Sequence, residues 1–349
     1  MNKYTKIGAS ALAGSLVATS AFAGELSVGG TWEVTGEFVT NSALSGATTN
    51  ETGNPFGSKS NLSFSGSGET DFGTASFFLF TQENMGSTAS HSVTLDMGDL
   101  GLVGFDQGTG AFGVSTIDDK TPTAYEEIWN GTAQSNADIL DGSGGSAGVF
   151  GYKNTFMGMN LNVEYAPSLS GGDAGDGAYA DTTNPDGSGL NFAITNNTLV
   201  EGLDFGFGYG KDEYDRKSTD VASIDDTQST VAYANYSFGP VTVGTTQSYT
   251  SGSVNSSGVT IGANEVEIYG IAFNVNENFS VSYTDYENTY LKYAGSSAAA
   301  DVSQDTTGFN AAYTMGGATL RITDAQMDNI GGTSGKNEDR TEVSLLLAF

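Results

Sequence analysis

The chain ends with the stretch RTEVSLLLAF, residues 340–349, which alternates between two kinds of side chain and finishes on an aromatic residue. Alternation with a period of two predicts a β-strand whose two faces meet different surroundings. Because chain ends in soluble proteins are commonly frayed and polar, a terminal strand of this kind needs a structural reason. Closure of a sheet against its own first strand supplies that reason, since closure leaves no unpaired strand edge. One face of the stretch carries Thr341, Val343, Leu345, Leu347 and Phe349.

The same alternation recurs along the whole chain, and no window of comparable length holds a helical period. The 49 glycines are spread along the chain, within and between these segments. We count about sixteen of them as strands, near residues 25–38, 58–69, 74–83, 89–97, 101–107, 147–154, 160–166, 188–196, 202–211, 227–238, 240–250, 264–273, 278–287, 304–314, 317–326 and 340–349.

The connections between these segments alternate between short and long. Tight turns are expected at 71–73, 98–100, 239–240 and 315–317, and long polar loops at 39–57, 108–146, 167–187, 212–226, 251–263, 288–303 and 327–339. An even number of strands with short turns at one end and long loops at the other is the plan of a membrane-spanning barrel. The sequence therefore predicts an all-β fold, a transmembrane antiparallel β-barrel.

The first residues predict a cleaved secretory signal peptide over 1–23. Lys3 and Lys6 precede an apolar run, which is followed by the small-residue cleavage pattern Ala21-Phe22-Ala23. The remaining chain, 24–349, contains no apolar run long enough for a transmembrane helix. It also shows no linker, so we expect 24–349 to form a single barrel domain.

Composition excludes several classes of function. The chain has 41 Asp and Glu against 12 Lys and Arg, a net charge of −29, which excludes a nucleic-acid partner because phosphate binding requires a basic surface. The 20 Phe and 16 Tyr argue against a disordered acidic chain. Cysteine is absent, which rules out disulfides, thiol catalysis and thiolate metal sites.

Taken together, the signal peptide, the strand count, the long loop after the fifth strand and the terminal Phe349 resemble the Gram-negative general porins, particularly the alphaproteobacterial type. The stretch DDKTPTAYEE, residues 118–127, adds a local likeness. The resemblance implies an outer-membrane homotrimer in contact with lipid and lipopolysaccharide. It also implies a passive channel for small hydrophilic solutes, with the third loop, 108–146, folded into the lumen as a constriction.

By the same resemblance, acidic residues of the third loop face basic residues of the wall across the pore. The loop acids are Asp118, Asp119, Glu126, Glu127, Asp138 and Asp141, and strand parity turns Lys59, Lys153, Arg321 and Arg340 inward. Parity also turns several acids inward, so acids outnumber bases and we expect the channel to prefer cations. These inward acids are Glu25, Glu33, Glu37, Glu164, Asp204 and Glu342.

The acidic loops offer oxygen ligands of the kind Ca²⁺ prefers, although none matches an EF-hand loop. We expect no required cofactor, and a calcium ion, if one binds, near Asp118 and Asp119. An enzyme is disfavoured because His91 is the single histidine and no nucleophile motif surrounds it. The alternatives that remain open are a solute-specific outer-membrane channel and a non-conducting structural or adhesive surface barrel.

Overall fold

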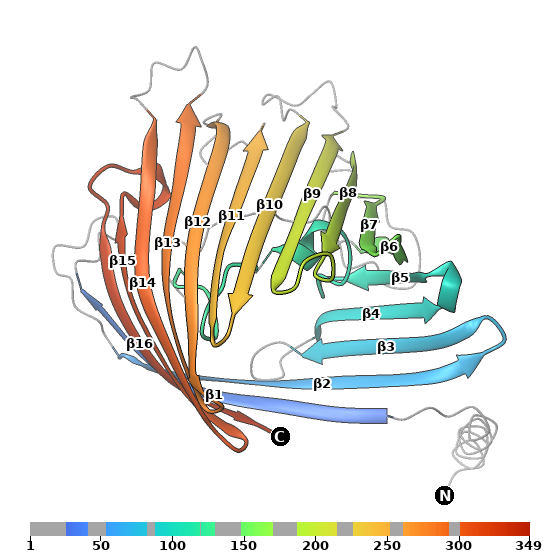
Figure 1. Ribbon diagram of the computed structural model, residues 1–349, viewed down its shortest axis with the longest axis horizontal. Helices are drawn as coiled ribbons and strands as arrows, with labels where there is room; N and C mark the ends of the chain where they lie inside the picture. Colours follow the sequence, from blue (N-terminus) through green and yellow to red (C-terminus); the bar gives the residue numbers. More distant parts are fainter. Residues whose placement is uncertain are drawn as a thin grey trace, which may run out of the picture.

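The computed structural model describes residues 26–40, 54–81, 88–118, 120–129, 148–169, 187–214, 226–251, 261–292 and 301–349. Within these ranges the chain forms one antiparallel sheet that closes on itself as a barrel (Figure 1). The strands predicted from the alternation are all present, and the four predicted tight turns join the strands expected. The all-β transmembrane barrel is therefore confirmed. The signal peptide predicted over 1–23 lies outside the described residues.

The strands follow one another around the barrel in sequence order. In the described ranges they are accompanied by three short 3-10 turns, η2 (Gly98–Leu100), η3 (Gly113–Ile117) and η4 (Ile330–Gly332). Among the described residues, no helix is long and apolar enough to cross a membrane. The strands are β1 (Leu26–Thr40), β2 (Phe56–Thr70), β3 (Gly73–Thr81), β4 (Thr88–Asp96), β5 (Leu102–Gln107), β6 (Val149–Phe156), β7 (Met159–Ala166), β8 (Gly187–Asn196), β9 (Leu203–Tyr214), β10 (Thr227–Phe238), β11 (Val241–Ser251), β12 (Ile261–Asn276), β13 (Phe279–Lys292), β14 (Val302–Met315), β15 (Ala318–Asp328) and β16 (Glu338–Ala348).

The terminal strand closes the barrel. β16 pairs antiparallel with β1, in a register that sets Trp32 opposite Leu347 and Phe38 opposite Thr341. Beyond the last ladder pair, the backbone N–H of Phe349 donates to the carbonyl oxygen of Gly30 at 2.9 Å, and Gly30 N–H donates back to Phe349 at 3.2 Å. Because these bonds satisfy the edge of the sheet, no unpaired row of backbone groups is left along β1 and β16.

The two faces of the sheet have opposite chemistry. On β16, Arg340, Glu342 and Ser344 are almost fully buried, whereas the intervening Val343 and Leu345 are 37% and 40% exposed. A water-soluble protein would bury the aliphatic residues and expose the charged ones. The outer face is therefore the apolar surface of a barrel that stands in lipid, and the inner face lines a polar lumen.

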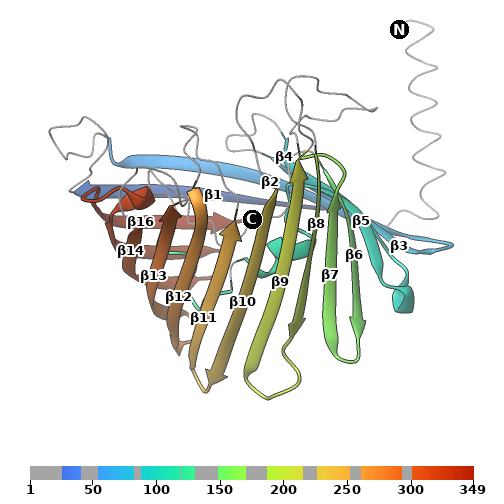
Figure 2. The same ribbon diagram turned by 90° about the horizontal axis from the view of Figure 1, so that it is seen from above.

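The two ends of the barrel also differ. Two-residue turns connect β2 to β3, β6 to β7, β10 to β11, β12 to β13 and β14 to β15, and Figure 2 shows the turns between β6 and β11 gathered at one end. The β6 to β7 turn places Met157 and Gly158 at positive φ, 52° and 80°, as tight hairpins with the native strand twist require. We call this the short-turn end and the opposite one the long-loop end.

The chain after β5 turns into the barrel, and we call its described residues 112–118 and 120–129 the inserted segment. Both views show it in teal inside the ring of strands (Figures 1 and 2). The main apolar core of the molecule lies between this segment and the inner wall, because elsewhere the inner face meets water. The core comprises Val114, Ile117, Ile128, Trp129, Ala193, Val231, Tyr233, Val266, Ile268, Tyr286, Ala325, Met327 and Ile330.

Candidate functional site

Asp106, near the end of β5, turns the chain away from the barrel wall. Its buried carboxylate accepts hydrogen bonds from the Thr109 N–H at 3.2 Å, from the Thr109 hydroxyl and from the Ala111 N–H at 3.1 Å. Gly108 and Gly110 adopt φ values of 78° and 66°, which residues with a side chain rarely adopt. The carboxylate thus satisfies the backbone of a bend that leads the chain into the lumen.

Phe112 anchors the start of the inserted segment. Its side chain is completely buried and lies on the inner wall, where β5 and β6 present Gly104 and Gly151. A Cβ at Gly151 would overlap the phenyl ring, so the ring can lie there only because both strands lack side chains at these points. The ammonium of Lys153 lies 5.2 Å from the ring centroid, in the range of a cation–π contact.

The next residues are held by amide side chains of the wall. The Gly113 N–H donates to Asn162 Oδ1 at 3.1 Å, and the Val114 N–H donates to Asn191 Oδ1 at 2.9 Å. Asn191 in turn donates from Nδ2 to Glu164 Oε1 at 2.8 Å. Glu164, which we expected to add negative charge to the pore, is 3% exposed and supports the inserted segment.

Strand glycines also make room for the middle of the segment. A Cβ at Gly208 would lie 3.0 Å from Ile117 Cδ1. A Cβ at Gly244 would lie 2.8 Å from Pro122 Cδ, and one at Gly270 would lie 2.8 Å from the Pro122 carbonyl oxygen. The inner face of the wall therefore carries bare backbone along the path of the inserted segment.

The far end of the segment is fixed by polar and aromatic contacts with β13 and β14. Asn310 Nδ2 donates to Thr123 Oγ1 at 3.1 Å and to the Glu126 carbonyl oxygen at 2.6 Å. Trp129 packs against Tyr286 with 4.7 Å between ring centroids. Since the segment is attached at both ends, it is held along the inner wall from β5 to β14, and the remaining wall comprises β15, β16 and β1 to β4.

Glu33 on β1 links charged residues of that remaining wall. Its carboxylate lies 3.2 Å from Lys59 Nζ and 3.4 Å from Arg321 Nη1. The Arg321 guanidinium also lies 5.0 Å from the ring centroid of Tyr125, whose hydroxyl hydrogen-bonds with Thr323. Burial raises the pKa of Tyr125 to about 12, so this hydroxyl keeps its proton at neutral pH.

Arg340 continues the charged group toward the long-loop end. Its Nε lies 3.3 Å from Glu37 Oε1, and its Nη2 pairs with Glu342. The side chain is 2% exposed, so two carboxylates surround a cation that has little contact with pore water. We call the residues on β1, β2, β15 and β16 the charged wall, namely Glu33, Glu37, Lys59, Arg321, Arg340 and Glu342.

Glu126 places the inserted segment in electrostatic contact with the charged wall. Burial raises the pKa of its carboxyl above the ordinary value, and the nearby Glu33 carboxylate raises it further. The cations of Arg321, Lys59 and Arg340 act in the opposite direction. Glu126 and Tyr125 of the inserted segment thus lie close to the charged wall.

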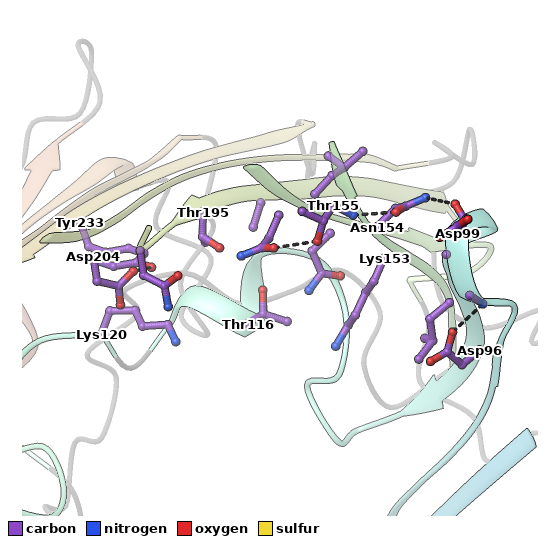
Figure 3. A pocket seen from close by; sticks show the side chains of 18 residues that line it. Asp96, Asp99, Thr116, Lys120, Lys153, Asn154, Thr155, Thr195, Asp204 and Tyr233 are labelled. Atoms are coloured by element: carbon purple, nitrogen blue, oxygen red, sulfur yellow. Dashed lines mark hydrogen bonds between the residues drawn. The ribbon is translucent and has the colours of Figure 1, made fainter. Parts of the chain in front are cut away.

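A second space lies in the lumen toward the short-turn end. It has a volume of about 860 Å³ and is bounded by β5 to β10, the turn before β5 and the inserted segment. Figure 3 shows Lys120 and Lys153 among its lining residues, and we call it the lysine cavity. Tyr233 donates a hydrogen bond to Asp204 Oδ1 at 2.9 Å in the same lining.

The predicted site residues separate into two groups. Lys59, Arg321 and Arg340 belong to the charged wall and act electrostatically on Glu126. Lys153 is not in that group, because β6 carries it to the lysine cavity. Asp118 and Glu127 are partly buried in the inserted segment. The acids that lie outside the described residues are Glu25, Asp119, Asp138 and Asp141.

The expected calcium site falls partly outside the same ranges. Asp118 lies at the end of η3, where its carbonyl oxygen accepts a hydrogen bond from the Lys120 N–H at 3.0 Å. Within the described chain, no group of three or more His, Asp and Glu side chains is placed to hold a metal ion. Calcium at Asp118 and Asp119 stays a prediction.

Comparison with known proteins agrees with this architecture. A family profile described as Gram-negative porin matches residues 8–348. The chain belongs to the Gram-negative porins. Membership places the protein in the outer membrane, with the short-turn end toward the periplasm and the long-loop end outside. Its general role is that of an outer-membrane porin channel.

Solved porin structures share the fold of this porin at low sequence identity. A refined porin structure is 16% identical, with a TM-score of 0.61 over 93% of this chain and 100% of its own. OmpT of Vibrio cholerae lacking loop L8 is 11% identical, with a TM-score of 0.63 over 93% and 99%. Salmonella typhi OmpF in complex with daunomycin is 12% identical, with a TM-score of 0.60 over 93% and 98%. No curated protein sequence matches the porin.

The sequence did not predict two structural roles in this porin, that of Asp106 at the bend and that of the strand glycines under the inserted segment. Asp106 has no sequence signal beyond its place at the end of a strand before two glycines, a pattern that marks a bend. Glycines such as Gly151 and Gly208 interrupt strands, and isolated strand glycines do indicate close approach of another backbone or ring. That signal could have located the path of the inserted segment, but not the residues that occupy it.

Proposed function

We propose that this porin is a passive aqueous channel for small hydrophilic solutes and ions, and that it prefers cations. The observation that carries the proposal is the composition of the narrow lumen. Four carboxylates, Glu33, Glu37, Glu126 and Glu342, stand there with three cations, Lys59, Arg321 and Arg340. An excess of fixed negative charge between low-dielectric walls concentrates cations and disfavours anions.

The arrangement of these charges supports diffusion without tight binding of ions. Lys59, Arg321 and Arg340 each have a carboxylate partner on the wall, so none presents an isolated positive charge to the pore. Glu33 offsets two of these cations, Lys59 and Arg321. Solute size is limited by the inserted segment, which is attached to the wall and occupies part of the lumen.

We further propose that the porin works as a homotrimer in contact with lipid and lipopolysaccharide. The apolar outer face of strands such as β1 and β16 supports burial in lipid or against another copy, since Trp32 and Val343 are exposed there. Enzymatic activity is not part of the proposal, because the family and fold are those of non-enzymatic channels. His91 lies on β4 with the parity of the exposed Val93.

Planar-bilayer recording of the refolded mature protein tests the proposal. Under a salt gradient, the reversal potential of a cation-selective channel has the sign of the equilibrium potential of the cation. A trimer appears as one insertion step whose current closes in three equal sublevels. Folded and inserted protein that carries no current would refute the channel and leave a structural or adhesive barrel. A reversal potential of the opposite sign would refute the cation preference alone.

A further inference from the structure

Two lysines from distant parts of the sequence line the same cavity. Lys120 belongs to the inserted segment and Lys153 to β6, and both side chains contribute to the lining of the lysine cavity (Figure 3). Neither side chain is fully buried, so both ammonium groups can meet a solute in the water of the lumen. The cavity lies on the periplasmic side of the inserted segment, beyond the narrow part of the pore.

Among the residues that the structure describes, these two cations differ from those of the charged wall in forming no ion pair. Within the described residues, Lys59, Arg321 and Arg340 all form ion pairs, whereas neither Lys120 nor Lys153 does. Asp106 is near enough to act electrostatically on Lys153. Its two oxygens, however, already accept hydrogen bonds from the bend after β5. The lining also carries Asp96, Asp99 and Asp204 and is not positive as a whole. The two ammonium groups, which form no ion pair within the described residues, are the part of it that can bind an anion.

The same lining offers groups that bind hydroxyls. The Asp204 carboxylate accepts a hydrogen bond from Tyr233 at Oδ1, and within the described chain its Oδ2 has no such donor. Asn162 lines the cavity and uses Oδ1 to hold the inserted segment, so its amide N–H groups can donate to a ligand. Thr195 adds a hydroxyl. A ligand that satisfies both sets of groups carries a negative charge at one position and hydroxyl groups at others.

We propose that the lysine cavity binds a small hydroxylated anion, a phosphorylated or carboxylated sugar, as it crosses the channel. The volume of about 860 Å³ is within the range of small-ligand sites, roughly 300 to 1,000 Å³, and leaves room for water around a monosaccharide. The inference rests on the proposed channel function and deepens it. The charged wall disfavours anions, and contact with Lys120 and Lys153 beyond it lowers the free energy of those that pass.

Current block in planar bilayers tests the site with glucose 6-phosphate, gluconate, glucose and inorganic phosphate as probes. Glucose 6-phosphate or gluconate should reduce the current at lower concentration than glucose or phosphate, because only they offer both a charge and hydroxyls. Block at equal concentrations by all four probes would overturn the proposal. Block by glucose 6-phosphate alone identifies a phosphate site, and block by gluconate alone a carboxylate site.

Substitutions locate the binding. Lys120→Gln and Lys153→Gln should each raise the half-blocking concentration about fivefold, since each removes one charge-assisted contact in a solvated site. Lys211→Gln is the matched control, because Lys211 is on β9 and pairs with Glu213 and Asp226 away from the cavity. Unchanged block in both lysine variants would overturn the site.

Calorimetric titration of the detergent-folded barrel with glucose 6-phosphate separates this proposal from the channel itself. A channel that conducts but neither binds nor is blocked by glucose 6-phosphate or gluconate refutes the cavity site and leaves the proposed function intact. A barrel that carries no current refutes the channel function. In that case the loss of binding heat in Lys120→Gln and Lys153→Gln still decides whether the cavity binds the anion.

Discussion

Replacing Phe112 with Ala should loosen the inserted segment without opening the barrel. The ring is completely buried between the segment and the glycines of β5 and β6, and Lys153 lies 5.2 Å from its centroid. Truncation of a buried Phe costs about 3–5 kcal/mol, and the lost cation–π contact adds about 0.5–1 kcal/mol. The equilibrium constant for attachment of the segment at this end falls by roughly 300-fold to 20,000-fold.

Single-channel recording measures the consequence. The strand ladder loses no hydrogen bond in Phe112→Ala, so the variant should still fold and insert. Its mean conductance should rise, and its current should become noisier, because the segment detaches from β5 and β6 more often. Phe309→Ala is the control, since Phe309 is 45% exposed on the outer face of β14. A Phe112→Ala channel with the conductance and noise of the wild type would refute the anchoring role.

Three further substitutions test the remaining parts of the lumen. Glu33→Gln leaves Lys59 and Arg321 without their shared carboxylate. The reversal potential should therefore shift toward the equilibrium potential of the anion, whereas the control Lys211→Gln should leave it unchanged. Burial raises the pKa of Glu126, so this carboxylate takes up its proton at a pH above the ordinary value of about 4.3. Cation preference should therefore decline from that higher pH as the solution is acidified, and Glu126→Gln should remove this early part of the decline; an identical pH profile in the variant would contradict the assignment. Asp106→Ala removes the acceptor of three hydrogen bonds at the bend after β5. A cost of about 1–3 kcal/mol should appear as faster proteolysis within residues 108–129, with the strands unaffected.

The strands could be predicted because each one meets lipid on one face and water on the other, which imposes a period of two on the local sequence. Strand ends were less predictable. β12 was expected over 264–273 and extends over Ile261–Asn276, while β13 was expected over 278–287 and extends to Lys292. Glu265, Glu267 and Glu287 are exposed near these ends, so polar side chains on the outer face conceal the alternation there.

The charged wall illustrates what parity alone leaves open. Parity turns Lys59 and Arg321 inward, but their common partner Glu33 depends on the register of β1 with both β2 and β16. Glu33 and Arg321 are 288 positions apart in the sequence and meet only because the barrel closes. Lys153 shares the inward parity and nevertheless lies elsewhere, since parity specifies a face of the sheet and not a position around the ring.

The sequence by itself therefore determined the barrel, its direction in the membrane and the polar character of its lumen, because these follow from the local alternation and from the lengths of the connections. Only the tertiary structure decided where the inserted segment lies and which charges face each other. Those features depend on contacts between distant strands, such as the Phe112 ring on Gly151 and the ion pairs of Glu33. No local pattern encodes such contacts, because the closure of the sheet is what brings their partners together.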